Sequence, residues 1–401
     1  MTAAPSLRRR VWSARAVEFA FWAAMAFLIP YLSVFYQQAG LSGFQIGLQT
    51  ALYAAMAMLI APVWGVLADR TGHPRLVFQI TLAGSAITAL VLGKQTGLLP
   101  ITLATAAYSA FVSGSMTLID VMVVHQIRGT DVGYGSVRLW GSLGWTAVVW
   151  MAGEWIVHSS VWAIFVGFGI GGFVTLAVAS WLVDPDLDSA TGPNFGFARA
   201  VWKNPALLWL AGGLLFGAMS EVGPFRFLAI YAVDLGGDEG VAGLAMAVGA
   251  FLEWPFMLAA DRLVLRLRAR RVLEIGALLW TATWVLAAIV PTAGWLVPVV
   301  VLNSASYTLF AVGMISAVTR RTPPERAGEA LGFFSVTLRS LAELLGGPLS
   351  GWGYDAATGR GMNAISAGIA LVAWVSLRRL AAIERRAGRE VSLPAAGRAD
   401  E

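Results

Sequence analysis

The chain has 401 residues, of which 58% are hydrophobic and only 13% are charged, and it contains no cysteine. Because soluble proteins carry about 25% charged residues, this composition excludes a protein that folds in water around one apolar core. The formal net charge of +5 comes from basic residues at the ends of apolar runs, so we do not expect a nucleic-acid-binding surface. Without cysteine there is no disulfide framework and no thiolate metal site.

Apolar runs of about 20 residues recur along the chain, and this is the length that an α-helix needs to cross a bilayer. Since backbone groups in lipid must be paired internally, we predict an all-α integral membrane protein. Twelve transmembrane helices are expected. The predicted spans cover residues 13–37, 42–68, 76–95, 98–125, 134–157, 160–183, 206–234, 239–262, 271–291, 294–318, 327–353 and 359–380.

The longest interruption between spans has six predicted helices on each side. It covers residues 184–205 and contains an Asp-Pro-Asp-Leu-Asp stretch. We therefore expect an N-terminal six-helix bundle in 1–183, a cytoplasmic linker in 184–205, a C-terminal six-helix bundle in 206–382 and a polar cytoplasmic tail in 383–401.

The positions of Lys and Arg predict the orientation of the chain. With the N-terminus inside, 24 of the 28 Lys and Arg residues fall on the cytoplasmic side, and only Lys94 and Arg360 fall outside. Basic residues favour the cytoplasmic side of a membrane. Both chain ends are therefore expected in the cytoplasm, with the protein in the inner membrane and monomeric. The basic run Arg8 to Arg10 is read as the cytoplasmic flank of the first helix, not as part of a cleaved signal.

A glycine-flanked Asp-Arg motif follows the second span, and a shorter copy follows the eighth span 192 residues later. The first copy resembles the loop between the second and third helices of the major facilitator superfamily, and the alternative is an ordinary charged loop. Glycine at its start would allow close helix approach, and its basic residues suit the anionic cytoplasmic face. The expected conformational-gating residues are Gly65, Asp69, Arg70, Gly72 and Arg75, with Asp261 and Arg262 in the second copy.

The fifth span carries Arg138 and, seven residues later, Trp145, so both side chains lie on one helix face. This stretch resembles the oligosaccharide–proton symporter branch (lactose permease-like) and related carriers of nucleosides and phenylpropionate-type acids. The resemblance implies that Arg138 and Trp145 contact the solute together with Asp120 of the fourth span. An Asp120–Arg138 pair would also neutralise two costly intramembrane charges, which leaves a purely structural ion pair as the alternative.

The second half departs from the lactose permease-like pattern. The spans 271–291 and 294–318 contain no ionisable residue within their apolar runs, whereas that branch places proton-coupling residues there. Galactoside specificity and that proton relay are therefore not expected.

Other charged residues inside predicted spans are functional candidates, because charge is costly in hydrocarbon. Glu221 and Arg226 flank Pro224, and a kink there would line the solute path. Arg339 and Glu343, four residues apart, could simply neutralise each other. The expected solute contacts are Asp120, Arg138, Trp145, Glu221, Arg226 and Glu253.

Three acids are candidates for proton coupling. Glu253 lies in the middle of its span without a cation in the same helix, so it could accept a proton or pair with another helix. Glu343 is the second candidate. Glu18, near the cytoplasmic end of the first span, is the third, with a purely structural pairing to Arg15 as the alternative.

The sequence thus predicts secondary active transport of a sugar, nucleoside or aromatic acid by alternating access, with proton coupling. Efflux of drugs or sugars on the same scaffold is the alternative within transport. A non-transporting solute sensor and a membrane enzyme are the alternatives outside it. We expect no enzymatic activity, cofactor or metal, because the three histidines are scattered and no phosphate-binding glycine loop occurs.

Overall fold

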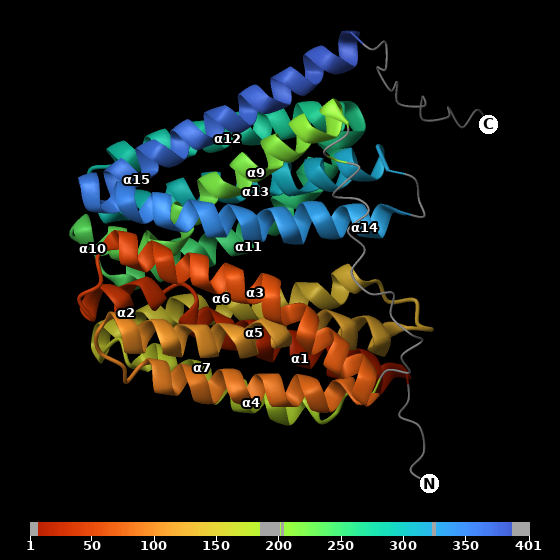
Figure 1. Cartoon of the computed structure of the whole chain (residues 1–401), viewed down its shortest axis with the longest axis vertical. Coiled ribbons are helices and arrows are strands. Elements are labelled where there is room, and N and C mark those ends of the chain that lie inside the picture. The colour runs from red at the N-terminus through yellow and green to blue at the C-terminus, as the bar shows by residue number, and fades with distance from the viewer. Residues whose placement is uncertain (1–6, 185–200, 202–203, 323–325, 387–401) are drawn as a thin grey trace.

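The computed structural model describes residues 7–184, 201, 204–322 and 326–386, and within these ranges the chain is helical with no strand. Two groups of helices lie side by side, one red to yellow and the other green to blue in Figure 1. The first group contains α1 (Leu7–Leu28), α2 (Leu32–Gln38), α3 (Gly43–Thr71), α4 (Pro74–Leu92), α5 (Leu98–Ile127), α6 (Tyr134–His158) and α7 (Ala163–Ala179). The second contains α9 (Pro205–Arg226), α10 (Leu228–Asp234), α11 (Glu239–Arg266), α12 (Ala269–Ile289), η1 (Ala293–Trp295), α13 (Leu296–Thr319), α14 (Ala327–Gly332), the π-helical turn η3 (Phe333–Thr337) and α15 (Leu338–Arg386).

Several helices are interrupted where the sequence disfavours a straight span. The helix α9 contains Pro224 and ends two residues later, and α10 resumes after Phe227. The long α15 has non-helical backbone angles at Ala357 and Thr358, which divide it into two segments. The expected kink beside Pro224 is therefore present, as a break between α9 and α10.

Nine stretches of the described chain are long and apolar enough to cross a membrane. One of them, 329–383, runs through the break at Ala357 and Thr358, and α7 with 17 residues is a shorter apolar helix. The chain is therefore an all-α integral membrane protein. Twelve crossings, the cytoplasmic location of both ends and the division into four segments stay predictions, and much of the predicted linker and tail lies outside the described residues.

The two groups meet closely at glycines along the pairs α3–α15 and α6–α11. A Cβ atom on Gly47 would lie 2.2 Å from the carbonyl oxygen of Gly347, and one on Gly153 would lie 2.5 Å from the carbonyl oxygen of Glu239. Any larger residue at these positions would push the backbones apart. Small residues are the usual means by which membrane helices approach this closely.

Hydrogen bonds also join the two groups at the end of the molecule where Gly47 meets Gly347. The Asp355 carboxylate accepts bonds from the backbone N–H groups of Gly43 and Phe44, at 2.6 and 2.8 Å. These are the first residues of α3, whose N–H groups have no partner within the helix. The Gln37 amide also donates to the Tyr354 hydroxyl at 3.3 Å. This end of the interface is therefore sealed by backbone packing and by polar contacts.

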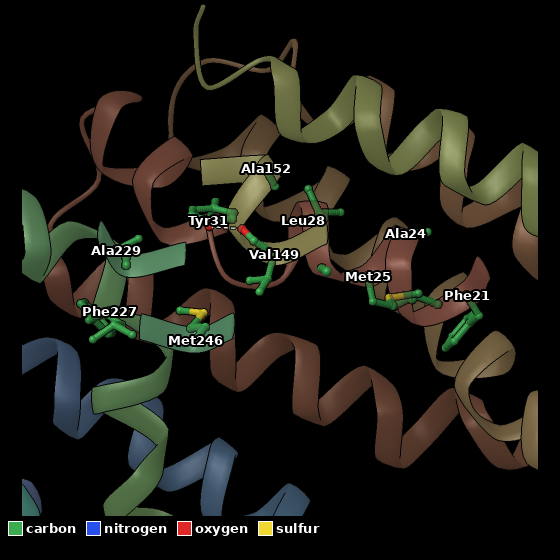
Figure 2. Packing of buried hydrophobic residues seen from close by; sticks show 14 of the residues in the cluster. Phe21, Ala24, Met25, Leu28, Tyr31, Val149, Ala152, Phe227, Ala229 and Met246 are labelled. Carbon is green, nitrogen blue, oxygen red and sulfur yellow. Dashed lines mark hydrogen bonds between the residues drawn. The ribbon is translucent and has the colours of Figure 1, made fainter. Parts of the chain in front are cut away.

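The first group is braced internally beside this seal. Figure 2 shows Tyr31 directed at the backbone of α6, where its hydroxyl donates to the Val149 carbonyl oxygen at 2.6 Å. A Cβ on Gly243 of the second group would meet the same hydroxyl at 2.5 Å. Tyr31 thus holds the α6 backbone at the place where α11 packs against it.

The Asp-Arg motifs lie at the opposite end and differ from the prediction in two respects. Asp69 and Arg70 occupy the last turn of α3 itself, because this helix continues past its predicted end to Thr71, and Arg262 is followed by a further helical turn of α11, which continues to Arg266. A Cβ atom on Gly65 would meet no described atom within 4 Å, so the expected close helix approach at this glycine is absent from this structure.

The glycine that ends α3 does have the expected turn geometry. Gly72 has φ +65°, a left-handed conformation that a glycine adopts without strain after a helix. Arg75 at the start of α4 pairs with Asp184, with 3.6 Å between Nε and Oδ2, and its backbone N–H donates to the same carboxylate. In this structure Arg75 therefore links α4 to the segment after α7.

Candidate functional site

A cavity of about 370 Å³ lies between the two groups of helices. Aromatic, charged and amide side chains from both groups line it. They include Trp22, Arg138, Gly141, Ser142, Trp145, Glu221, Phe225, Glu253, Trp284, Asn303, Tyr307, Arg339 and Asn363. Of the expected solute contacts, Arg138, Trp145, Glu221 and Glu253 line this cavity.

Arg138 and Trp145 are arranged around Trp22 of α1. The Arg138 guanidinium carbon lies 4.1 Å from the centroid of the Trp22 ring, which is a cation–π contact. The Trp22 and Trp145 rings meet edge to face, with their centroids 6.3 Å apart. The helix face that Arg138 shares with Trp145 is therefore completed by an indole from another helix.

Glu18 is the acid that lies next to this cluster. It is fully buried, one helical turn before Trp22 on α1. A Cβ on Gly141 would lie 2.5 Å from Nη1 of Arg138, 2.5 Å from Cδ1 of Trp22 and 2.8 Å from Oε2 of Glu18. The absence of a side chain at Gly141 is what lets these three groups converge.

Asp120 is placed differently from the expectation. Its Oδ1 accepts a hydrogen bond from the Tyr134 hydroxyl at 2.6 Å, and Asp120 is not among the residues that line the cavity. Within the described chain no ion pair joins Asp120 to Arg138. The predicted Asp120–Arg138 pair is therefore absent from this structure: Asp120 is bound by Tyr134 at the start of α6, and the Arg138 guanidinium lies over Trp22.

Across the cavity, Trp145 faces an aromatic ring of the other group. Its ring lies 6.5 Å from that of Phe225 between centroids, and the two planes are inclined by only 24°. Such nearly parallel rings provide two apolar faces at the boundary between the groups.

Four side chains of the second group form a charge chain in which cations and carboxylates alternate: Arg226, Glu343, Arg339 and Glu221. Arg339 Nη1 lies 3.2 Å from Oε2 of Glu221, and its Nε lies 3.8 Å from Oε1 of Glu343. Arg226 Nη2 lies 3.2 Å from Oε2 of Glu343. The four residues thus connect α9 to α15 by two cross-helix pairs and one pair within α15. The simple self-neutralised Arg339–Glu343 pair is only the weakest of these contacts.

Arg226 does not line the large cavity as predicted. It lines a second space of about 30 Å³, together with Tyr36, Gln49, Tyr53 and Tyr108 of the first group. Its guanidinium carbon lies 5.3 Å from the centroid of the Tyr53 ring. Glu221 and Arg226 both belong to α9, and five residues of helix place their side chains about 140° apart around its axis, so the two residues border different spaces.

Glu253 reaches the large cavity from α11, directly before Trp254 and Pro255. None of the ion pairs found in the described chain involves Glu253. It therefore stands apart from the charge chain of α9 and α15, although both border the same space.

Several lining residues were missed by sequence reasoning. Trp280 donates to Asn303 Oδ1 at 2.7 Å and thereby orients that amide. Trp284 and Asn363 are buried, and each has a polar atom without a partner in the described structure. Nothing in their local sequence distinguishes them. Trp22 could have been found, because it follows Glu18 by four residues and shares its helix face.

The cavity and its helical framework agree with comparisons to known proteins. Residues 11–362 match the MFS_1 like family. The chain is 30% identical to maltose permease of Geobacillus stearothermophilus over 306 residues, which are 76% of this chain and 77% of that protein. It is 22% identical to a probable 3-phenylpropionic acid transporter of Escherichia coli (strain K12), over 77% of this chain and 82% of that one.

A solved structure supports the fold independently. The crystal structure of the nucleoside transporter NupG superposes with a TM-score of 0.80 at 18% identity, covering 92% of this chain and 98% of that one. At this identity the likeness concerns the fold alone. The family match over most of the chain, together with a two-group helical framework around a polar cavity, identifies the protein as a membrane transporter of the MFS_1 like family, within the major facilitator superfamily, and not an enzyme.

Proposed function

We propose that this protein carries a small organic solute across the cytoplasmic (inner) membrane by alternating access, with the large cavity as its solute site. The observation that carries the proposal is that one cavity is lined from both helix groups by aromatic rings and by four charged side chains. Rocking of one group against the other would expose such a site to each side in turn. We further propose twelve crossings, cytoplasmic chain ends and a monomeric protein.

The present state would be the inward-facing one. The seal formed by Asp355, Gly47 and Gly347 lies opposite the end that carries Asp69 and Arg70. The excess of basic residues assigns the Asp69–Arg70 end to the cytoplasm. The sealed end is therefore the outer one, and solute would leave or enter from the cytoplasmic end.

The proposed solute is a sugar, a nucleoside or an aromatic acid. Relatives are named for maltose and for 3-phenylpropionic acid, and a structural neighbour is named for nucleosides. The cavity volume of about 370 Å³ lies within the usual range for small-molecule sites. Trp145 and Phe225 would stack on a ring, while Arg138 would bind polar groups of the solute.

We propose proton coupling because three carboxylic acids lie within the predicted membrane spans. Glu253 at the cavity is the first candidate, and Glu343 in the charge chain and Glu18 beside Arg138 are the others. Binding or release of a proton at one of these groups would change the balance of charge inside the membrane, and so favour one of the two states.

The test is counterflow in proteoliposomes loaded with unlabelled maltose, uridine or 3-phenylpropionate. Wild-type protein should accumulate labelled solute transiently for at least one of the three, and Arg138→Ala should abolish this exchange. Exchange of none of the three, or an unaffected Arg138→Ala variant, would contradict the proposed site.

A further inference from the structure

We infer that Asn303 of α13 determines which solutes the cavity binds. Its amide NH2 group, held in place by Trp280 of α12, donates a hydrogen bond to an uncharged oxygen of the solute. A sugar or a nucleoside carries such oxygens at both ends, whereas an aromatic monocarboxylic acid has one polar end. This inference rests on the proposed carrier function and narrows the range of its solutes.

The orientation of the Asn303 amide follows from the chemistry of its partner. Nε1 of Trp280 lies 2.7 Å from Oδ1 of Asn303. An indole N–H can only donate, so the atom that it contacts must be the amide oxygen. The NH2 group, which can donate but cannot accept, is therefore directed away from Trp280.

This NH2 group is open to the cavity. Asn303 is one of the lining residues and is only half-buried. Within the described chain its Nδ2 has no hydrogen-bond partner, and Nδ2 is not among the buried polar atoms that lack one. A solute in the cavity can therefore reach this donor.

The helix that carries Asn303 is fixed on two sides. Trp280 is fully buried and packs on Phe310 of α13, with the ring centroids 4.7 Å apart. On the α11 side, a Cβ on Gly249 would lie 2.8 Å from Oγ of Ser304, the residue after Asn303, so the two helices touch there. A donor that is already held in one position loses little conformational entropy when it binds a solute.

The opposite wall of the cavity explains why two polar ends are needed. Arg138 lines the cavity from the first group of helices, and a solute carboxylate would bind its guanidinium through charge-assisted hydrogen bonds. The hydrocarbon ring of 3-phenylpropionate would then cover the Asn303 NH2 group without bonding it, and a desolvated donor without a partner costs free energy. A sugar or a nucleoside meets Arg138 with one oxygen and Asn303 with another, so both groups are satisfied.

The reversed orientation of an acid is opposed by Glu253. This residue follows the Gly249 contact by one helical turn and borders the cavity from α11, without an ion pair in the described chain. A carboxylate bound at Asn303 would lie beside it, and like charges repel strongly in a low dielectric. The oxygen that Asn303 binds is therefore an uncharged one.

The Trp280–Asn303 bond also fastens α12 to α13, as polar bonds between membrane helices do. A bond with this purpose alone would not require an accessible NH2 group. Its loss would weaken the protein without changing how tightly a solute is bound. Trp280 is therefore a positioning residue for Asn303, and the two roles differ in their effect on solute exchange.

Counterflow of labelled maltose, uridine and 3-phenylpropionate into proteoliposomes with the purified full-length protein tests the inference. Wild type should exchange maltose or uridine. Asn303→Leu, which has nearly the same volume, should raise the half-saturating concentration of that solute at least about fivefold, because it leaves a solute oxygen unpaired. The matched control Thr283→Val removes a buried hydroxyl at the same α12–α13 contact, outside the cavity lining, and should leave the half-saturating concentration unaltered.

Trp280→Phe tests the positioning role. It removes the indole N–H but keeps a ring against Phe310, so the Asn303 amide can turn, and the half-saturating concentration should rise less than in Asn303→Leu. In the Asn303→Leu background, Trp280→Phe should cause no additional rise, because there is no amide left to orient. A purely structural contribution of Trp280 would persist in that background.

An unchanged half-saturating concentration in folded Asn303→Leu, an equal rise in Thr283→Val, or wild-type exchange of 3-phenylpropionate alone would overturn the inference and leave the carrier function standing. If Asn303→Leu does not fold, Asn303→Ala removes the amide without adding an apolar branch and should give the same rise. Exchange of none of the three probes by wild type would contradict the carrier function itself, and the inference with it.

Discussion

Arg339 of α15 lies closer to Glu221 of α9, at 3.2 Å, than to Glu343 one turn away in its own helix, at 3.8 Å. The stronger contact is thus the one that joins two different helices at the cavity. Glu343 is in turn bound by Arg226, so each carboxylate of this chain has a cation from the neighbouring helix. The arrangement keeps four intramembrane charges neutral while two of them, Glu221 and Arg339, border the solute space.

The pairing of Glu221 with Arg339 predicts coupled effects on stability. Arg339→Gln leaves Glu221 without its cation in a buried position, and Glu221→Gln leaves Arg339 with one partner fewer. Each single variant should therefore lower the free energy of unfolding, and the two losses together should exceed the loss in the double variant. A double-mutant cycle by thermal unfolding in detergent should give a coupling of about 0.5–3 kcal/mol, and strict additivity would refute the pairing.

Trp145 is predicted to contribute to solute affinity through its ring. Trp145→Ala removes the face opposite Phe225 and should raise the half-saturating concentration in counterflow about 3- to 10-fold, the equivalent of about 0.5–1.5 kcal/mol. Trp145→Phe keeps an aromatic face and should stay within about threefold of wild type. The control is Trp181→Ala, which changes an exposed indole away from the cavity. Equal effects of the two alanine variants would refute a specific role.

Substitution of Glu253 is predicted to abolish proton-driven accumulation of the solute while leaving solute exchange intact. Glu253→Gln keeps the size of the side chain but cannot release a proton at any accessible pH. Counterflow, which requires no net proton movement, should persist, whereas uptake driven by an imposed pH gradient should be lost. Asp131→Asn serves as the control, with both activities retained. Gradient-driven accumulation by Glu253→Gln would assign the coupling to another group.

The glycine contact at the sealed end is predicted to control which state is populated. Leucine at Gly47 would meet the Gly347 backbone, so Gly47→Leu should open this end. Because the protein has no native cysteine, spin labels attach only at the introduced residues of Gln38→Cys and Ala356→Cys. The distance between the two labels reports the opening. Their distance should lengthen in Gly47→Leu and stay unchanged in Gly368→Leu, whose Cβ has open space around it. An unchanged distance in both would show that the seal does not depend on this contact.

Much of the fold could be predicted because lipid imposes simple rules on a chain. Apolar runs of helical length and the asymmetry of Lys and Arg require no knowledge of tertiary contacts. Helix ends were less predictable. The continuation of α3 through Asp69 and Arg70, and of α11 beyond Arg262 to Arg266, reflects helical turns beyond the predicted spans, which hydropathy does not detect.

The site was predictable where its geometry is local. Arg138 and Trp145 share a face by helical spacing alone, and both line the cavity. Contacts between helices were not predictable from spacing. Asp120 is bound by Tyr134 of the next helix, Arg226 lies against Tyr53 of the other group, and these outcomes depend on how four helices pack.

The central claim, that one solute site between the two groups is open to the cytoplasm and alternates, can be tested by a single cysteine. Ser142 lines the cavity, and Ser142→Cys would be the only thiol in the protein. A membrane-impermeant maleimide should label it rapidly in inside-out vesicles and slowly in right-side-out vesicles. Whichever of maltose, uridine or 3-phenylpropionate the protein exchanges should slow the labelling. Equal labelling from both sides, or labelling that none of the three solutes affects, would contradict the account.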